Sequence, residues 1–293
     1  MSSNQLFKRI RYALSFLPDE LYIQLNYFAH FGRFANLKEP VTYNEKLNWL
    51  KLHDHNPLYT KLVDKYEVKK YVSDVLGPQY VIPTLGVWDS FDEIRFEDMP
   101  NKFVLKCTHD SEGLIIVKEK ELLDVNFARS KLNKALNQNF YYIGREWPYK
   151  DVKPRIIAEK YMEDDVDGEL RDYKFFCFDG EPKALFIATE RGVNDVKFDY
   201  YDLDFNHLNI KQKYKNSSKY IRKPSNFNTM MEFSRILSNE MPHVRVDFYE
   251  VNGKLYFGEM TFYHFSGFMP FEPKEWDVIF GQWLQLPSIG RFA

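Results

Sequence analysis

The chain has 293 residues, of which 44% are hydrophobic and 17% aromatic, and its formal net charge at pH 7 is −2. This length and apolar content suit a folded protein of one large domain or two to three closely packed ones. The near balance of charge gives no basis for nucleic acid as the main partner, so none is expected.

The sequence contains no apolar run of about eighteen residues, the length that a membrane-spanning helix needs. Its N-terminus lacks the apolar core and cleavage site of a secretory signal peptide. Residues 6–16 are apolar with three basic residues interleaved, which favours a packed first helix; peripheral membrane contact is the alternative. Cys107 and Cys177 each lie in an expected strand, so we expect buried reduced thiols and a cytoplasmic location, at the inner membrane face if the first helix binds lipid.

The first part of the chain, residues 1–79, is expected to be helical. Apolar residues recur at steps of three and four between Leu14 and Phe28. Thr42 followed by Glu45 has the spacing of a capping box, which predicts that a helix begins there. Gly77-Pro78 predicts the end of this helical region.

From Tyr80 the pattern changes to short β-prone segments bounded by polar or turn residues. A helix is expected between two of them and another late in the chain, with a hairpin at Asp179-Gly180 and a long polar loop before the second helix. The expected strands are 80–85, 103–107, 114–117 and 155–159, the helices 126–138 and 229–240, the hairpin 175–187 and the loop 202–228. Helices followed by mixed elements indicate an α+β fold.

The segment 244–262 predicts a second hairpin, because Asn252-Gly253 lies between alternating apolar and aromatic residues. A two-residue loop would pair Asp247 with Gly258 and leave Glu259 on the opposite face. A three-residue loop, which ends at Lys254, pairs Asp247 with Glu259 instead. Two adjacent carboxylates repel unless a cation lies between them, and hard oxygen ligands suit Mg²⁺ shared with a phosphate. A surface hairpin with two solvated acids is the alternative.

Three further segments carry polar groups that could serve a site. Lys106 to Gly113 could fold over a phosphate with its backbone N–H groups, or form an ordinary polar loop. The strand end 158–162 could contact an adenine edge before the acidic linker 163–169, or end in a solvated turn. Asp172 and Lys174 share one strand face, as a surface ion pair or as part of a site.

The segment 211–223 has six cations, two tyrosines and no acidic residue. It could receive an anionic substrate, although a solvated loop is the alternative. The histidines His109, His243 and His264 lack metal-ligand spacing with cysteine, so no zinc site is expected. Asp202-Leu-Asp204 lies in the polar region rather than in a strand–loop context that a glycosyltransferase would need.

Several of these motifs, taken in this order, resemble the TupA-like branch of the ATP-grasp superfamily, named for teichuronopeptide biosynthesis and associated with bacterial polysaccharide clusters. The similarity spans residues 18–287. The motifs that carry it are TYNEKLNWLKL from 42, PLYTKLVDKY from 57, IPTLGVW from 82, FVLKCTH from 103, DYKFFCFDG from 172 and RVDFYEVNGKLYFGE from 245.

The resemblance implies an ATP-grasp fold, in which two α+β subdomains enclose ATP and a helical N-terminal region precedes them. The subdomain with the phosphate loop would span 80–162, and the one with the metal-binding hairpin would span 163–293. The helical region would span 1–79. The implied ligands are ATP and Mg²⁺.

On the nucleotide side, the resemblance implies two phosphate-binding lysines, Lys65 and Lys106, with Ser111 in the loop between the flanking strands. Glu159 and Met162 resemble the hinge that contacts adenine, with Tyr161 behind it. Asp165 or Glu169 would hold the ribose hydroxyls.

On the hairpin side, Arg245 resembles the arginine that steadies the transferring phosphate, and Lys174 is grouped with it as a catalytic cation. Asp247 and Glu259 resemble the Mg²⁺ ligands, with Thr261 where the superfamily often has asparagine. Since a hydroxyl is a weaker ligand, water would complete the coordination there.

The implied reaction is ATP-dependent amide formation through an acyl phosphate. The carboxylate or amine would belong to an anionic sugar or polysaccharide precursor such as a uronic acid, with an amine as co-substrate. Phosphotransfer to a glycan precursor and nucleotide binding without turnover are the alternatives, because the same motifs would serve both.

Overall fold

The computed structural model describes residues 14–164, 170–190 and 196–288. Its first part consists of helices α2 (Asp19–Phe31), α3 (Tyr43–His53), α4 (Pro57–Val63) and α5 (Glu67–Leu76). The capping box is confirmed, because the Thr42 hydroxyl accepts from the Glu45 N–H while the Glu45 carboxylate accepts from the Thr42 N–H. Most of the expected helix over residues 6–16 lies outside the described residues. No helix in the described ranges is long and apolar enough to span a bilayer.

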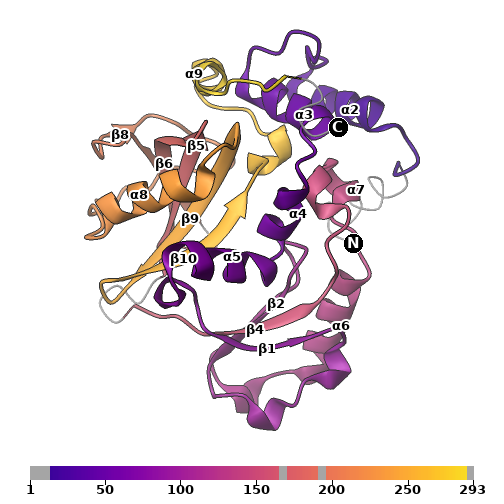
Figure 1. Ribbon diagram of the computed structural model, residues 1–293, viewed down its shortest axis with the longest axis vertical. Coiled ribbons are helices and arrows are strands. Elements are labelled where there is room, and N and C mark those ends of the chain that lie inside the picture. The colour runs from indigo at the N-terminus through magenta and orange to yellow at the C-terminus, as the bar shows by residue number, and fades with distance from the viewer. Residues whose placement is uncertain (1–13, 165–169, 191–195, 289–293) are drawn as a thin grey trace.

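A four-stranded antiparallel sheet follows, with the strand order β1-β4-β2-β3. Its strands are β1 (Thr84–Trp88), β2 (Phe103–Cys107), β3 (Leu114–Val117) and β4 (Ile156–Lys160). The helix α6 (Val125–Leu136) lies between β3 and β4 in the sequence. The apolar side of α6 contributes Ala128 and Leu132 to a core of its own with Phe103 and Leu105. In Figure 1 this sheet and α6 form the lower part of the molecule.

A six-stranded antiparallel sheet forms the second unit, with the order β10-β9-β5-β6-β7-β8. Its strands are β5 (Asp172–Phe178), β6 (Glu181–Thr189), β7 (Lys197–Tyr201), β8 (His207–Leu208), β9 (His243–Val251) and β10 (Lys254–Thr261). The Asp-Gly hairpin β5–β6 is confirmed, and both turn residues have positive φ as such a turn requires.

The two faces of this sheet have different covers. On one face, α8 (Phe227–Ser238) packs against β5, β6 and β9, as Figure 1 shows, and Phe227 lies against Phe175. On the other face, Phe176 meets Tyr43 of α3 and Phe280 of α9 (Glu275–Trp283) edge to face. The N-terminal helices therefore share the core of the six-stranded sheet.

The two sheets approach each other near α5 and β10. Val81 makes an isolated parallel bridge with Phe257, and the Lys65 N–H donates to the Thr108 carbonyl at 3.0 Å. Two short elements, α7 (Tyr141–Gly144) and the turn at 147–149, follow α6 in the chain; the turn contacts α4, and α7 contacts the turn. The junction thus joins β10 to the segment before β1, and the end of α4 to the residues after β2.

Most expected elements are confirmed within a few residues, with clear exceptions. The strand expected at 80–85 begins four residues later, because Pro78 and Tyr80 lie in a short 3-10 turn. The strand β7 and the helix α9 were not expected from the sequence. Cys107 and Cys177 are buried free thiols, as expected.

Candidate active site

The β9–β10 hairpin brings the two expected carboxylates side by side, but not for the expected reason. The loop contains only Asn252 and Gly253, both at positive φ, so the predicted three-residue loop is wrong. A register shift between Phe257 and Glu259 restores the predicted pairing of Asp247 with Glu259. The extra residue is Gly258, where an added Cβ would lie 3.0 Å from the Asp247 carbonyl oxygen. A β-bulge therefore supplies the register that the turn does not.

Arg245 is the centre of the hairpin cluster. Its Nε and Nη2 each donate to one Asp247 oxygen at 2.7 Å, which is a bidentate pair. Nη2 also lies 3.1 Å from Glu259 Oε1 and 3.0 Å from Thr261 Oγ1. One guanidinium thus holds all three expected metal ligands.

His264 supplies the remaining contact of Arg245. Arg245 Nη1 donates to His264 Nδ1 at 2.9 Å, so Nε2 carries the imidazole proton and donates to Gln212 Oε1 at 2.8 Å. Burial is the main cause that holds the pKa of His264 well below its usual value, and the charge of Arg245 is the second. The ring is therefore neutral. Gln212 is fixed in turn by the Tyr200 hydroxyl and the Met269 carbonyl. Sequence reasoning missed both His264 and Gln212, which no spacing pattern marks.

Lys174 completes this cluster from β5. Its ammonium contacts the Asp247 carboxylate, lies 2.7 Å from Asp172 Oδ2 and 4.0 Å from Glu259 Oε1. The pair of Asp172 and Lys174 forms as expected but is buried rather than on the surface. Among the described residues, two cations here face three carboxylates, so these side chains together carry one negative charge in excess.

Burial and charge act in opposite directions on these carboxyls. Burial raises the pKa of Asp247, against the pull of Arg245 and Lys174. For Glu259, desolvation works against the charged form, but Lys174 and Arg245 outweigh it and lower the pKa to about 2. The Glu259 side chain is 43% exposed, so its charged group remains accessible to an incoming cation.

The donor set fits Mg²⁺ in kind, since two carboxylates and a hydroxyl are hard oxygen ligands that leave room for phosphate and water oxygens. Among the described residues, no group of three or more His, Cys, Asp or Glu side chains is arranged to hold a metal. The Asp247 oxygens accept from Arg245 and Lys174 here. A cation would therefore enter at Glu259 and require these donors to give up at least one oxygen.

A second cluster lies on the four-stranded sheet. The buried Glu159 carboxylate accepts from Lys106 Nζ at 2.5 Å and also contacts Lys69 Nζ. Burial opposes its charge, but Lys106 and Lys69 lower the pKa of Glu159 to about 2. Its carboxylate thus faces two lysines, whereas the sequence predicts an adenine contact there. The cluster carries one positive charge in excess.

Lys69 was missed by sequence reasoning, which assigned the first phosphate-binding position to Lys65. Lys69 lies on α5 beside the buried stripe of Val68 and Val72, and its side chain is only 12% exposed. A lysine next to the apolar stripe of an amphipathic helix is the signal that could have found it. Lys65 lies one turn earlier, and its ammonium contacts the Asp110 carbonyl.

The segment between β2 and β3 folds as a turn that is closed by a hydrogen bond from the backbone to a side chain. The Asp110 carboxylate accepts the Gly113 N–H at 3.0 Å, which turns this acid inward, while Ser111 and Glu112 are exposed. Asp110 therefore holds the turn together and leaves Ser111 accessible, the arrangement that a phosphate contact by Ser111 would need.

The hinge residues lie at the end of β4. Tyr161 and Met162 are partly exposed, and the Lys102 ammonium lies 5.8 Å from the centre of the Tyr161 ring. The Lys160 N–H donates to the Pro83 carbonyl, which ties this strand end to the segment before β1. The two ribose candidates, Asp165 and Glu169, lie outside the described residues.

Lys65 and Asp110, whose side chains lie near the four-stranded sheet, act electrostatically on groups close to the hairpin. Lys65 is among the cations that lower the pKa of Glu259 across the junction. Burial raises the pKa of Tyr149, and Glu259 and Asp110, from the two sheets, both add to that rise.

Comparisons with known proteins give one family and a set of distant structures. The profile of the family described as TupA-like ATPgrasp matches residues 45–285, which is most of the chain. No curated protein matches. Among solved structures, D-alanine-D-alanine ligase from Helicobacter pylori is 15% identical with a TM-score of 0.40, over 76% of this chain and 61% of that one.

Two other solved structures are similarly distant. D-cycloserine synthetase DcsG is 19% identical, with a TM-score of 0.41 over 78% of this chain and 71% of that one. ATP-grasp ligase PsnB, solved with a minimal precursor, is 9% identical, with a TM-score of 0.40 over 73% and 57%. The family match, together with two antiparallel sheets preceded by helices, settles the fold. The chain belongs to the TupA-like ATP-grasp family.

Proposed function

We propose that this protein is an ATP- and Mg²⁺-dependent ligase that joins a carboxylate to an amine. The observation that supports this most is the pair of complementary clusters. Lys69 and Lys106 exceed Glu159 in charge and suit an anion, whereas the hairpin acids exceed Arg245 and Lys174 and suit a cation. MgATP carries both an anionic chain of phosphates and a divalent cation, so it matches this division of charge.

In the proposed reaction, the substrate carboxylate attacks the γ-phosphorus, and the bond from that phosphorus to the bridging oxygen of ADP breaks. Lys106 and Lys69 neutralise charge on the phosphates, and Arg245 and Lys174 reduce the repulsion between the two anions. Asp247 and Glu259 would hold Mg²⁺, which would supply positive charge against the phosphates. The amine then attacks the acyl phosphate carbonyl and inorganic phosphate leaves, so that an amide forms and the amine loses a proton.

The substrate class and setting are also proposals. An anionic sugar or polysaccharide precursor such as a uronic acid would supply the carboxylate, in bacterial surface-polysaccharide or capsule biosynthesis. The cytoplasm supplies ATP and keeps Cys107 and Cys177 reduced. Asp165 and Glu169 remain the proposed ribose contacts, and Met162 the proposed adenine contact.

Trapping of the intermediate tests this proposal. The protein is incubated with MgATP, a panel of uronic acids and hydroxylamine, which intercepts an acyl phosphate as a hydroxamate. A ligase gives hydroxamate and ADP in equal amounts, and Arg245→Lys lowers both. A kinase instead gives a stable phosphorylated sugar without hydroxamate, and nucleotide binding without any product would contradict both activities.

A further inference from the structure

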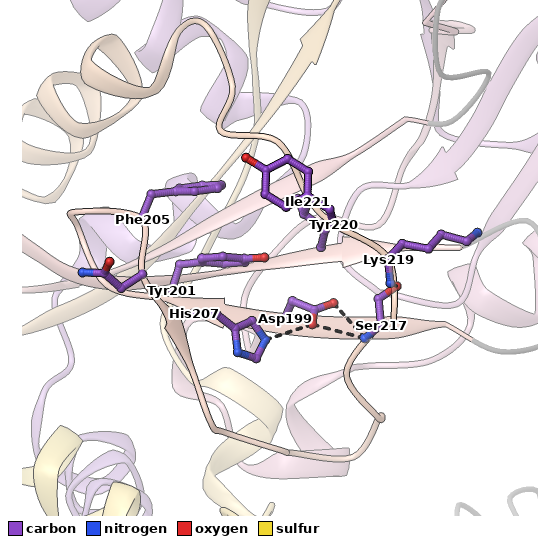
Figure 2. Close-up of a pocket in the computed structure, with 9 residues that line it drawn as sticks. Asp199, Tyr201, Phe205, His207, Ser217, Lys219, Tyr220 and Ile221 are labelled. Atoms are coloured by element: carbon purple, nitrogen blue, oxygen red, sulfur yellow. Dashed lines mark hydrogen bonds and ion pairs between the residues drawn. The ribbon is translucent and has the colours of Figure 1, made fainter.

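A cavity of about 530 Å³ lies beside β7 and β8, at the edge of the six-stranded sheet farthest from the hairpin. This volume is within the range of roughly 300–1,000 Å³ that is typical of small-molecule sites. Figure 2 shows side chains that converge on it from β7, from β8 and its preceding turn, and from the basic segment 211–223. None of them takes part in the candidate active site.

The cavity lies on the opposite face of the sheet from that site. Asp199 pairs with Ile187, which pairs with Tyr173, so these three side chains share one face of the sheet. Lys174 follows Tyr173 directly and pairs with Asp247, so both of these side chains lie on the other face. Because successive strand residues point to opposite faces, Asp199 and Tyr201 lie on the α8 side. A ligand here would therefore not compete with nucleotide.

The base of the cavity is aromatic and rigid. Tyr201 and Phe205 stack with centroids 4.4 Å apart and an interplanar angle of 16°, and Phe205 meets Phe227 of α8 edge to face. Phe205 holds this position with a left-handed backbone, φ 69°. On the rim, Tyr220 is 89% exposed, although the next residue, Ile221, is buried. Figure 2 shows the Tyr220 ring on the side of the cavity opposite His207.

The polar side of the cavity is pre-organised. The buried Asp199 carboxylate accepts from His207 Nε2 at 3.1 Å and from the Ser217 N–H at 3.1 Å. A carboxylate has about four acceptor positions, so these donors leave capacity for a ligand hydroxyl. Lys219 and Asn206 also line the cavity, and the Lys219 ammonium is largely exposed, 3.7 Å from Glu190.

We propose that this cavity binds a saccharide unit that carries a carboxylate, as a second subsite for a glycan substrate. A pyranose has an apolar C–H face that suits the tyrosine rings, and hydroxyls that suit Asp199, Asn206 and His207. Lys219, the lysine that lines the cavity, favours an anionic sugar over a neutral one. The glycan role rests on the proposed function, whereas saccharide binding itself does not.

Calorimetric titration with trigalacturonate tests this proposal, with maltotriose as the neutral saccharide and triaspartate as the non-saccharide anion. The wild type binds trigalacturonate more tightly than either comparison ligand. Tyr220→Ala weakens that binding about tenfold or more, and Lys219→Ala reduces the preference for trigalacturonate over maltotriose. Phe127→Ala, which removes an exposed ring on α6, leaves the affinity unchanged.

Three results would overturn the proposal. The first is triaspartate bound as tightly as trigalacturonate, the second is an unchanged trigalacturonate affinity in Tyr220→Ala, and the third is no saccharide binding to the wild type. The thermal shift caused by MgATP is measured on the same samples and is expected to be equal in wild type and Tyr220→Ala. A missing MgATP shift with intact saccharide binding would count against the ligase and not against this subsite.

Discussion

The two charged clusters use the same residue types with opposite results. On the four-stranded sheet, two lysines enclose one carboxylate, and one positive charge remains. Around the hairpin, within the part of the chain that the structure describes, two cations meet three carboxylates, and one negative charge remains among these side chains. A buried charge is tolerated only with a partner, so each cluster is stable alone but lacks one charge of complementary sign. The difference indicates which end of MgATP each would receive.

The largest expected effect comes from removal of the central acid of the hairpin cluster. Asp247→Ala leaves Arg245 and Lys174 buried without their main partner, which should lower the free energy of unfolding by about 3–5 kcal/mol. Urea denaturation measures this. Asp204→Ala, at an exposed position, should change stability by less than about 0.5 kcal/mol. Equal effects of the two substitutions would show that the hairpin cluster is not a tightly paired network.

Glu159, the acid of the cluster on the four-stranded sheet, predicts that the stability of the protein depends on pH. Because the folded state lowers the pKa of Glu159 to about 2, the stabilisation is complete above its ordinary pKa and is lost as pH falls toward 2. Integrated over that range, the effect is on the order of 3 kcal/mol. Denaturation from pH 6 to pH 2.5 compares wild type with Glu159→Gln. Their difference in stability should shrink with falling pH, and a constant difference would contradict the ion triad.

The bulge that sets the hairpin register is tested by Gly258→Ala. The added Cβ would press on the Asp247 carbonyl at 3.0 Å and the Tyr249 ring at 3.1 Å. We expect a loss of about 1–3 kcal/mol, as for other overpacked positions. At Gly253 nothing lies near an added Cβ, but φ is positive, so Gly253→Asn, which tolerates that conformation, serves as the mild control. A Gly258→Ala variant as stable as wild type would argue against the bulge.

A similarly modest effect should come from the neutral partner of Arg245. His264→Leu removes the acceptor at Nδ1 but leaves the bidentate contact with Asp247, so the free energy of unfolding should fall by about 1–3 kcal/mol. If His264 positions Arg245, the substitution should lower kcat for ADP release from MgATP more than it changes KM. A change in stability without any change in kcat would make His264 purely structural.

The sequence predicted the composition of the hairpin cluster better than its geometry. Asp247, Glu259, Thr261 and Arg245 meet as expected, because strand alternation and the Asn-Gly signal fix most of the hairpin. The register depends on Gly258, whose small size suits a bulge but does not by itself specify one. The buried contact between Lys174 and Asp247 also could not be inferred, since local alternation does not reveal which strands will neighbour β5.

Contacts distant in sequence account for what was missed. Lys69 meets Glu159 across ninety positions of the chain, and His264 meets Gln212, which lies in a segment without periodicity before α8. The aromatic cavity at Tyr201 depends on β7, which no turn signal announced. Local patterns predict elements and their faces, whereas these pairings follow from sheet order, which single-sequence patterns specify weakly.

Binding of ATP with and without Mg²⁺ tests the central claim most directly, by calorimetry on wild type, Lys69→Met and Glu259→Gln. The account predicts that Mg²⁺ strengthens ATP binding to the wild type and that Glu259→Gln loses this gain but still binds metal-free ATP. Lys69→Met should weaken ATP binding about tenfold with or without the metal, because it removes a phosphate partner rather than a metal ligand. The division of charge between the two clusters would be contradicted if Mg²⁺ strengthened ATP binding equally little in both variants. It would also be contradicted if the wild type did not bind MgATP.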